Sequence, residues 1–132
     1  MSERFQFNNF KEYEHANRYM EFNRIEFVEL EEDHCILRHI PDENSLNING
    51  LIHGGLLATM MDVAAATMVR KSGNNCSTAG FTVNYLRPGK GTVYAKAEYI
   101  KRGKRLNVVH SYCYDESGTL ISDAVVTLCL ID

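Results

Sequence analysis

The most continuous hydrophobic stretch of the chain lies between residues 55 and 71. Leucine, alanine, methionine and valine fill most of its positions, and most of these residue types favour helices. The stretch predicts a helix over residues 55–71, in which Arg70 and Lys71 complement the helix dipole and Gly73 ends the helix. Because its apolar residues surround the axis rather than lining one stripe, we expect this helix to be buried.

Shorter segments on both sides are rich in strand-forming residues and often alternate hydrophobic with polar positions. We predict strands over residues 25–30, 35–40, 77–86, 92–100, 106–114 and 120–131. The alternation is clearest in residues 92–100, where Val93, Ala95, Ala97 and Tyr99 share one face. The turns at residues 87–91, 101–105 and 115–118 are short, so each is expected to join two antiparallel strands.

A second helix is predicted over residues 7–20, because Phe10, Tyr13 and Met20 recur near helical spacing. Together the elements predict an α+β fold in which one antiparallel sheet wraps around a long, buried central helix. With 132 residues the chain fits one domain, residues 1–132, in which residues 1–23 would form an N-terminal helical extension.

Charge and composition exclude several classes of function. A net charge of −3 gives no general attraction to nucleic acid or to anionic membranes. No apolar run approaches the roughly 20 residues of a membrane span, and the N-terminus lacks the apolar stretch of a signal peptide, so we expect a cytoplasmic protein. The four cysteines form no Cys-x-x-Cys pair and are expected to be free structural thiols.

The run His53-Gly54-Gly55, which opens the hydrophobic helix, is the strongest candidate for chemistry. The first N–H groups of a helix lack partners inside the helix, and the dipole makes that end positive, so such a corner can stabilise an oxyanion. Asp62 lies two turns further on among apolar residues and is a candidate base or nucleophile. The pair suggests acyl-transfer chemistry. The alternative is that Asp62 lies on one wet edge of the helix and has no role.

The spacing of these two groups predicts an oligomer. Gly54 and Asp62 are eight residues apart, which is about 12 Å of rise along one helix. A reacting carbonyl must lie about 3 Å from both its oxyanion donor and its nucleophile, so the two groups can serve one reaction only if they come from two chains. Antiparallel helices around a two-fold axis would achieve this, and an isologous dimer would hold two equivalent sites.

Three polar residues near these groups each have two interpretations. His53 could contact a substrate or act as a base, or it could hold the turn, and we favour the turn. Asn47 could hydrogen-bond a carbonyl oxygen or an attacking water, and Thr78 could position that water from the next strand. Otherwise Asn47 is a loop cap and Thr78 is a strand hydroxyl.

The turn at residues 101–105 concentrates positive charge in an acidic protein. Its cations are Lys101, Arg102, Lys104 and Arg105, to which Arg87 and Lys90 could add. Such a patch could hold the phosphates of coenzyme A, or it could be a solvated hairpin turn. No aromatic platform accompanies it, which disfavours nucleic acid. The absence of a Gly-x-Ser-x-Gly motif disfavours a serine hydrolase, and the histidines lack metal-ligand spacing.

In combination, these features resemble the hotdog-fold acyl-CoA thioesterases, especially the PaaI-like branch of the 4-hydroxybenzoyl-CoA thioesterase superfamily. The matching positions are Asn47, residues 53–55, Asp62, Thr78, residues 83–88 and residues 100–104. The resemblance covers nearly everything between residues 24 and 131, and it implies that the sheet and its central helix form a hotdog fold.

The resemblance also implies a reaction, the hydrolysis of an acyl-CoA thioester to a free acid and coenzyme A without a metal or redox cofactor. The N–H of Gly54, assisted by Asn47, would polarise the thioester carbonyl. Asp62 of the partner subunit would activate water or attack directly, and Thr78 would orient the water. Gly55, Arg87 and the cations of residues 101–105 would contact the substrate.

Two further expectations accompany the resemblance. The subunits should form a homodimer and then a dimer of dimers, which is a homotetramer. The alternative function is a non-catalytic acyl-CoA binding or sensing module on the same fold, because a pure binder does not need Asp62. A hotdog dehydratase is a weaker alternative, since His53 stands at the turn rather than beside an acidic residue in the helix.

Overall fold

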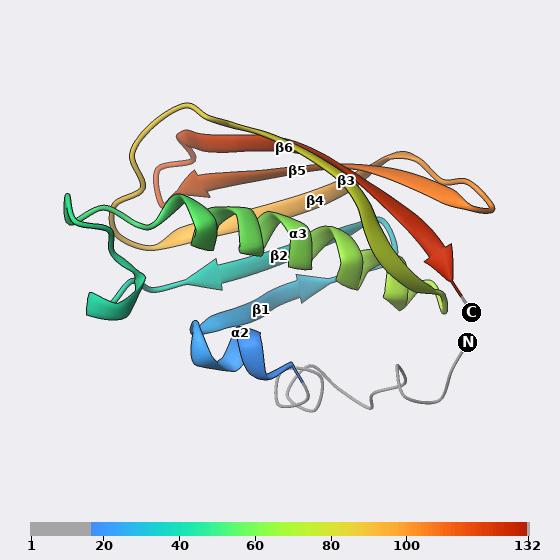
Figure 1. Cartoon of the computed structure of the whole chain (residues 1–132), viewed down its shortest axis with the longest axis horizontal. Coiled ribbons are helices and arrows are strands. Elements are labelled where there is room, and N and C mark those ends of the chain that lie inside the picture. The colour runs from blue at the N-terminus through green and yellow to red at the C-terminus, as the bar shows by residue number, and fades with distance from the viewer. Residues whose placement is uncertain (1–16, 132) are drawn as a thin grey trace.

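The computed structural model describes residues 17–131, which form a six-stranded antiparallel sheet curled around one long helix (Figure 1). The order of strands across the sheet is β1-β2-β4-β5-β6-β3. The helices are α2 (Arg18–Phe22) and α3 (Gly54–Lys71), with a 3-10 turn η2 (Glu43–Ser45). The strands are β1 (Ile25–Leu30), β2 (His34–His39), β3 (Asn75–Tyr85), β4 (Val93–Lys101), β5 (Leu106–Asp115) and β6 (Leu120–Ile131). This arrangement is the antiparallel sheet around a central helix that the sequence pattern predicted, and it matches the hotdog fold that the resemblance implied.

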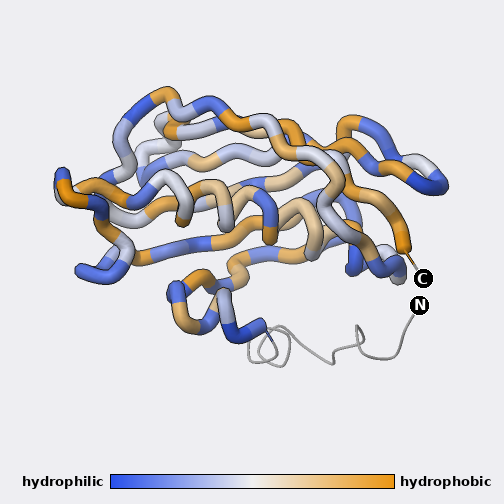
Figure 2. The backbone as a smooth tube through the Cα atoms, viewed as in Figure 1, coloured by the Kyte–Doolittle hydropathy of each residue, from blue (hydrophilic) through white to orange (hydrophobic). Residues whose placement is uncertain are grey.

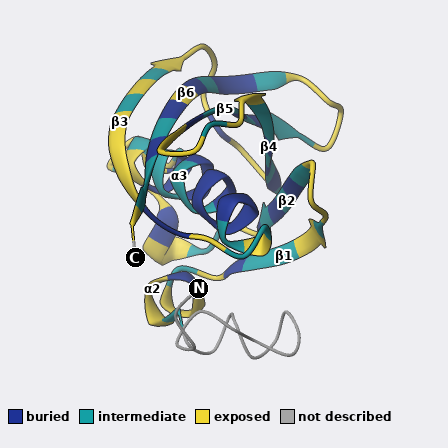
Figure 3. Cartoon of the chain, turned by 90° about the vertical axis from the view of Figure 1, so that its right-hand side faces the viewer, coloured by how far each residue is buried: buried dark blue, intermediate teal, exposed yellow. Residues whose placement is uncertain are grey.

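Strand β4 shows how the sheet closes around the helix. Val93, Ala95 and Ala97 are fully buried and alternate with partly exposed residues, which confirms the predicted alternation. Two of these three side chains are alanines, so the helix can approach the sheet closely without leaving a void. Figure 3 shows α3 inside the curve of the sheet, with the exposed strand β3 at one edge.

Helix α3 is buried on one side and partly open on the other. Met60, Met61 and Met68 are fully buried, and the buried Ser111 hydroxyl donates a 2.8 Å hydrogen bond to the Met61 carbonyl oxygen. The half-exposed residues near its middle are Ala58, Thr59, Asp62 and Val63. The prediction that α3 is buried on all sides is therefore wrong for this stripe, because the sheet covers only part of the helix circumference.

The connection between β3 and β4 differs from the prediction. The short segment after β3 does not form a hairpin, because β4 pairs with β2 and β5 while β3 pairs with β6 at the far edge. Both edges of β4 are thus occupied, and the chain crosses from one side of the sheet to the other. Gly89 anchors this crossing, since its carbonyl oxygen accepts a 3.0 Å hydrogen bond from the Ile52 N–H.

The remaining predictions concern element ends and the N-terminus. Helix α3 begins at Gly54, one residue earlier than predicted, and β3 begins at Asn75 rather than at residue 77. Most of the predicted helix 7–20 lies outside the described residues. Within them, α2 is capped by the Asn17 side chain and inserts Met20 into the core. Among residues 17–131, neither helix has the length and apolar character needed to cross a bilayer.

Replacing Leu37 by alanine tests the position of the core. Leu37→Ala should lower the free energy of unfolding by about 2–5 kcal/mol, because the side chain is fully buried and its loss leaves a cavity. The matched control is Leu106→Ala. It removes the same atoms from a side chain that is 48% exposed, so the free energy of unfolding should fall by less than about 1 kcal/mol. Urea unfolding at one protein concentration measures the stability of both variants. Equal losses of stability would contradict the placement of Leu37 in the core.

Candidate active site

The start of α3 leaves one backbone donor open. His53 is the N-cap residue, its Nδ1 accepts a 3.1 Å hydrogen bond from the Gly55 N–H, and its carbonyl oxygen accepts from the N–H groups of Leu56 and Leu57. The N–H of Gly54 has no acceptor among residues 17–131. Because the helix dipole makes this end positive, Gly54 presents a free donor where an anionic oxygen would be stabilised.

Tyr85 packs against this corner from the end of β3. Its hydroxyl donates a 2.8 Å hydrogen bond to the Gly54 carbonyl oxygen. The ring lies so close that a Cβ on residue 54 would be 3.3 Å from Tyr85 Cζ, which explains why glycine fits there. Burial raises the pKa of Tyr85, which keeps the hydroxyl protonated as a donor. The sequence offers no signal for this contact, since the residues are 31 positions apart.

Asp62 lies on the open stripe of α3 and meets Thr78 of β3. The Thr78 hydroxyl donates a 2.7 Å hydrogen bond to Asp62 Oδ1. These two residues line an open depression of about 230 Å³ together with Ala58, Thr59 and Phe81. The structure thus brings together Asp62, which the sequence singled out as a candidate base or nucleophile, and Thr78, which it singled out as a hydroxyl that could position the attacking water.

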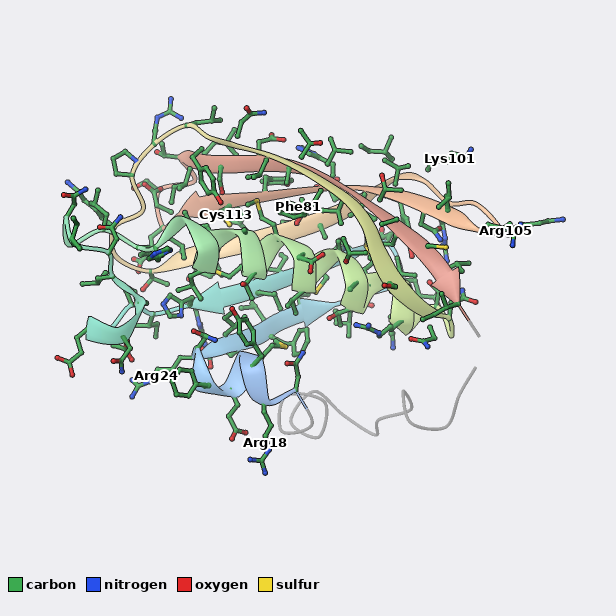
Figure 4. The ribbon with its side chains drawn as sticks, viewed as in Figure 1. Arg18, Arg24, Phe81, Lys101, Arg105 and Cys113 are labelled. Carbon is green, nitrogen blue, oxygen red and sulfur yellow. The ribbon has the colours of Figure 1, made fainter. Side chains whose placement is uncertain are left out.

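A bulge in β3 determines which side chains reach this depression. The pairing of β3 with β6 shifts between Thr78 and Gly80, so Ala79 is an extra residue. Side chains alternate between the faces of a strand, so residues 78 and 81 would otherwise point in opposite directions. Because of the bulge, Thr78 and Phe81 both line the depression beside α3, and Phe81 can be followed in Figure 4.

The depression around Asp62 does not extend to the start of the helix within one chain. Its lining includes neither His53 nor Gly54, which lie about two turns earlier in α3. The free amide and the carboxylate are therefore separate features of a single subunit, as the spacing predicted.

Asn47 and His53 are both engaged in local structure. Asn47 Oδ1 accepts hydrogen bonds from the N–H groups of Asn49 at 2.9 Å and Leu51 at 3.2 Å, which closes a turn in the loop. His53 caps the helix as described. These contacts agree with the interpretation of Asn47 as a loop cap and of His53 as the residue that holds the turn.

The cations predicted to form one patch lie at two ends of the molecule. Lys101 at the end of β4 is exposed, as are Lys104 and Arg105 in the turn that follows it. This turn is strongly hydrophilic (Figure 2), and Lys101 and Arg105 are labelled in Figure 4. Arg87 lies in the β3–β4 connection at the opposite end (Figure 1), where it donates a 2.7 Å hydrogen bond to the Leu120 carbonyl oxygen. The prediction that Arg87 and Lys90 add to the basic turn is therefore wrong within one subunit, because β3 and β4 do not form a hairpin.

Arg102 differs from the other cations of the basic turn. Its Nη2 donates a 2.8 Å hydrogen bond to the Ser72 hydroxyl at the end of α3, and its guanidinium lies 4.7 Å from the centre of the Tyr99 ring. Arg102 therefore ties the turn to the helix. In residues 17–131, no group of three or more His, Cys, Asp or Glu side chains could hold a metal ion.

The sheet curled around one helix and the amide corner at the helix start define a hotdog protein with features suited to acyl transfer. The model of the Thioesterase superfamily matches residues 49–122, which is more than half of the chain. The chain therefore belongs to the Thioesterase superfamily, and the matched segment contains the amide corner, Asp62, Thr78 and the basic turn.

Two relatives extend this match. The protein SSO1253 of Saccharolobus solfataricus, which carries an esterase name, is 34% identical over 112 residues that cover 80% of this chain and 73% of that protein. YigI of Salmonella typhimurium, named as a medium/long-chain acyl-CoA thioesterase, is 25% identical over 131 residues that cover 83% of this chain and 84% of YigI.

Solved structures show the same fold. A hypothetical thioesterase of Streptococcus pneumoniae, determined with coenzyme A, matches with a TM-score of 0.77 and 25% identity, covering 81% of this chain and 85% of that one. The PaaI protein of E. coli matches with a TM-score of 0.83 and 21% identity, covering 89% and 90%. These likenesses confirm the resemblance to hotdog thioesterases, including PaaI, that the sequence indicated.

The capping role of His53 can be tested by stability. His53→Ala should lower the free energy of unfolding by about 1 kcal/mol, because the Gly55 N–H loses its acceptor. Asparagine also accepts at an N-cap, so His53→Asn should recover most of this loss in urea unfolding. If His53→Asn were as unstable as His53→Ala, capping would not account for the histidine.

Proposed function

We propose that this protein is an acyl-CoA thioesterase, which hydrolyses an acyl-CoA thioester to a free acid and coenzyme A. The observation that carries the proposal is the free Gly54 N–H at the start of a largely buried helix whose open side presents a carboxylate held by a hydroxyl. Membership of the Thioesterase superfamily supports the reaction class. The name of YigI and the coenzyme A complex of the pneumococcal neighbour support the substrate class.

Each active site is proposed to combine two subunits. The two reactive groups are about 12 Å apart along α3, which is too far for one thioester carbonyl. Within residues 17–131, strand β3 is an edge strand that pairs only with β6, and its residues 77–80 are exposed. Pairing of two such edges around a two-fold axis would set the α3 helices antiparallel and bring Asp62 of one subunit toward Gly54 of the other. A homotetramer would follow from pairing two dimers.

The proposed reaction begins with the thioester oxygen accepting a hydrogen bond from the Gly54 N–H. Asp62 of the partner subunit takes a proton from water as the water oxygen attacks the carbonyl carbon. Collapse of the tetrahedral intermediate breaks the carbon–sulfur bond, and the leaving thiolate receives the proton from Asp62. Direct attack by the carboxylate, through an anhydride, is the second route. Thr78 holds one carboxylate oxygen in either route, and heavy oxygen from labelled water would enter Asp62 only in the second.

The exposed cations of the basic turn are proposed to hold the phosphates of coenzyme A. Lys101, Lys104 and Arg105 suit this role better than Arg102, which is already bonded to Ser72. Asn47, Gly55 and Arg87 are proposed to contact substrate from the other end of the subunit. A cytoplasmic location is part of the proposal, and the four free cysteines support it.

A proline at residue 54 tests the amide donor. Gly54→Pro removes the N–H at the first helical position, where proline is tolerated, and adds the proline ring. The extended His53 backbone (ψ 132°) suits a following proline. We expect kcat to fall about 10²- to 10³-fold with a panel of acyl-CoA thioesters, measured by release of free thiol.

The matched control is Gly54→Ala, which adds the same Cβ beside Tyr85 but keeps the N–H. It should retain far more activity than Gly54→Pro. Equal activity of the two variants would exclude the Gly54 amide as the oxyanion donor. A wild-type protein that binds the whole panel without releasing thiol would instead favour the acyl-CoA sensing module.

Mixed dimers test the shared site. Asp62→Asn and Gly54→Pro should each be nearly inactive alone, because each lesion affects both sites of a dimer. When the two variants are co-expressed in equal amounts, half of the dimers should be mixed, and each mixed dimer should hold one intact site. The mixture should therefore recover roughly a quarter of wild-type activity. If the mixture stays inactive, the two groups do not come from different subunits.

A further inference from the structure

The peptide that joins Gly54 to Gly55 is held at both ends by side chains. Its carbonyl oxygen accepts the 2.8 Å hydrogen bond from the Tyr85 hydroxyl, and its N–H donates to His53 Nδ1 at 3.1 Å. The next carbonyl, that of Gly55, accepts a 3.0 Å hydrogen bond from the Thr59 hydroxyl. Two successive glycines would by themselves leave the backbone free to adopt many conformations. These three hydrogen bonds restrict that freedom.

This restriction matters for the free Gly54 N–H. The His53 carbonyl points into the helix, where it accepts from Leu56 and Leu57 at 2.9 and 3.2 Å. The peptide between His53 and Gly54 is trans and planar, so the Gly54 N–H points opposite to the His53 carbonyl, out of the helix start. The direction of the Gly54 N–H depends on the backbone torsions of Gly54. Tyr85 restricts these torsions because its hydroxyl holds the carbonyl of the same residue.

The sheet, rather than the helix, fixes the position of Tyr85. Tyr85 is the last residue of β3 and pairs with Ser122 of β6. Directly after it, the N–H groups of Leu86 and Arg87 both donate to the Ile121 carbonyl oxygen, at 2.8 and 3.0 Å. The Tyr85 ring also fills the space beside the Gly54 Cα. The β3–β6 pairing therefore holds the backbone of Tyr85, from which its side chain reaches the start of α3.

We propose that Tyr85 is a positioning residue for the thioesterase reaction, in which its hydroxyl, acting through the Gly54 carbonyl, keeps the Gly54 N–H aimed at the developing oxyanion. This inference rests on the proposed function. A donor that is aligned in advance stabilises the transition state without reorganisation, so its alignment affects kcat more than substrate binding.

Replacing Tyr85 by phenylalanine removes the hydroxyl and keeps the ring. Tyr85→Phe should lower kcat about 3- to 10-fold, which is the range expected for one lost hydrogen bond, while KM changes less than about twofold. The matched control is Tyr112→Phe on β5. It removes a hydroxyl that donates a 2.8 Å hydrogen bond to Glu98 on the face of the sheet away from α3, and it should leave kcat and KM unchanged.

Backbone NMR relaxation provides a measurement that does not depend on activity. The order parameters of the Gly54 and Gly55 amides should fall in Tyr85→Phe and stay at wild-type values in Tyr112→Phe. Unchanged order at both glycines in Tyr85→Phe would overturn the inference, as would an unchanged kcat or an equal loss in Tyr112→Phe. If the wild-type protein hydrolysed no acyl-CoA, the proposed function would fail. The order parameters of the Gly54 and Gly55 amides would still show whether Tyr85 orders the start of α3.

Discussion

The burial of one side of α3 is the constraint on which the candidate site depends. Met60, Met61 and Met68 are fully enclosed between the helix and the sheet, and burying each such side chain contributes about 1.5–3 kcal/mol. This burial fixes the rotation of the helix about its axis. Successive residues are about 100° apart around a helix, so once Met61 faces the core, Asp62 falls at the edge of the sheet's cover. The hydrogen bond from Ser111 to the Met61 carbonyl reinforces this rotation.

Strand β3 supplies the second part of the arrangement. The same strand contacts α3 through Thr78 at the carboxylate and through Tyr85 at the amide corner. It lies at the edge of the sheet, so it is also the element through which a second subunit could complete each site. One strand thus holds the acid and the amide donor at fixed places on a single subunit, while the reaction that we propose draws one group from each of two subunits. The pairing of β3 with β6 therefore positions both the contact of Thr78 with Asp62 and the contact of Tyr85 with Gly54.

Local patterns predicted the elements well. The helix over residues 55–71 differs from α3 by one residue, and the alternation in β4 matches its burial, because both patterns depend on neighbours along the chain. The prediction failed where distant segments compete for the same edge. A short turn after β3 suggested a hairpin, yet both edges of β4 are taken by β2 and β5, and Arg87 is carried to the far end of the molecule as a result.

The sequence by itself determined the helix, most of the strands, the glycine corner and the carboxylate two turns beyond it, because composition and periodicity act over a few residues. Only the tertiary structure decided which side chains meet. The bulge at Ala79 turns Thr78 toward Asp62, and the β3–β6 pairing delivers Tyr85 to Gly54. Strand register and order depend on contacts between residues far apart in the chain, and local periodicity carries no information about them.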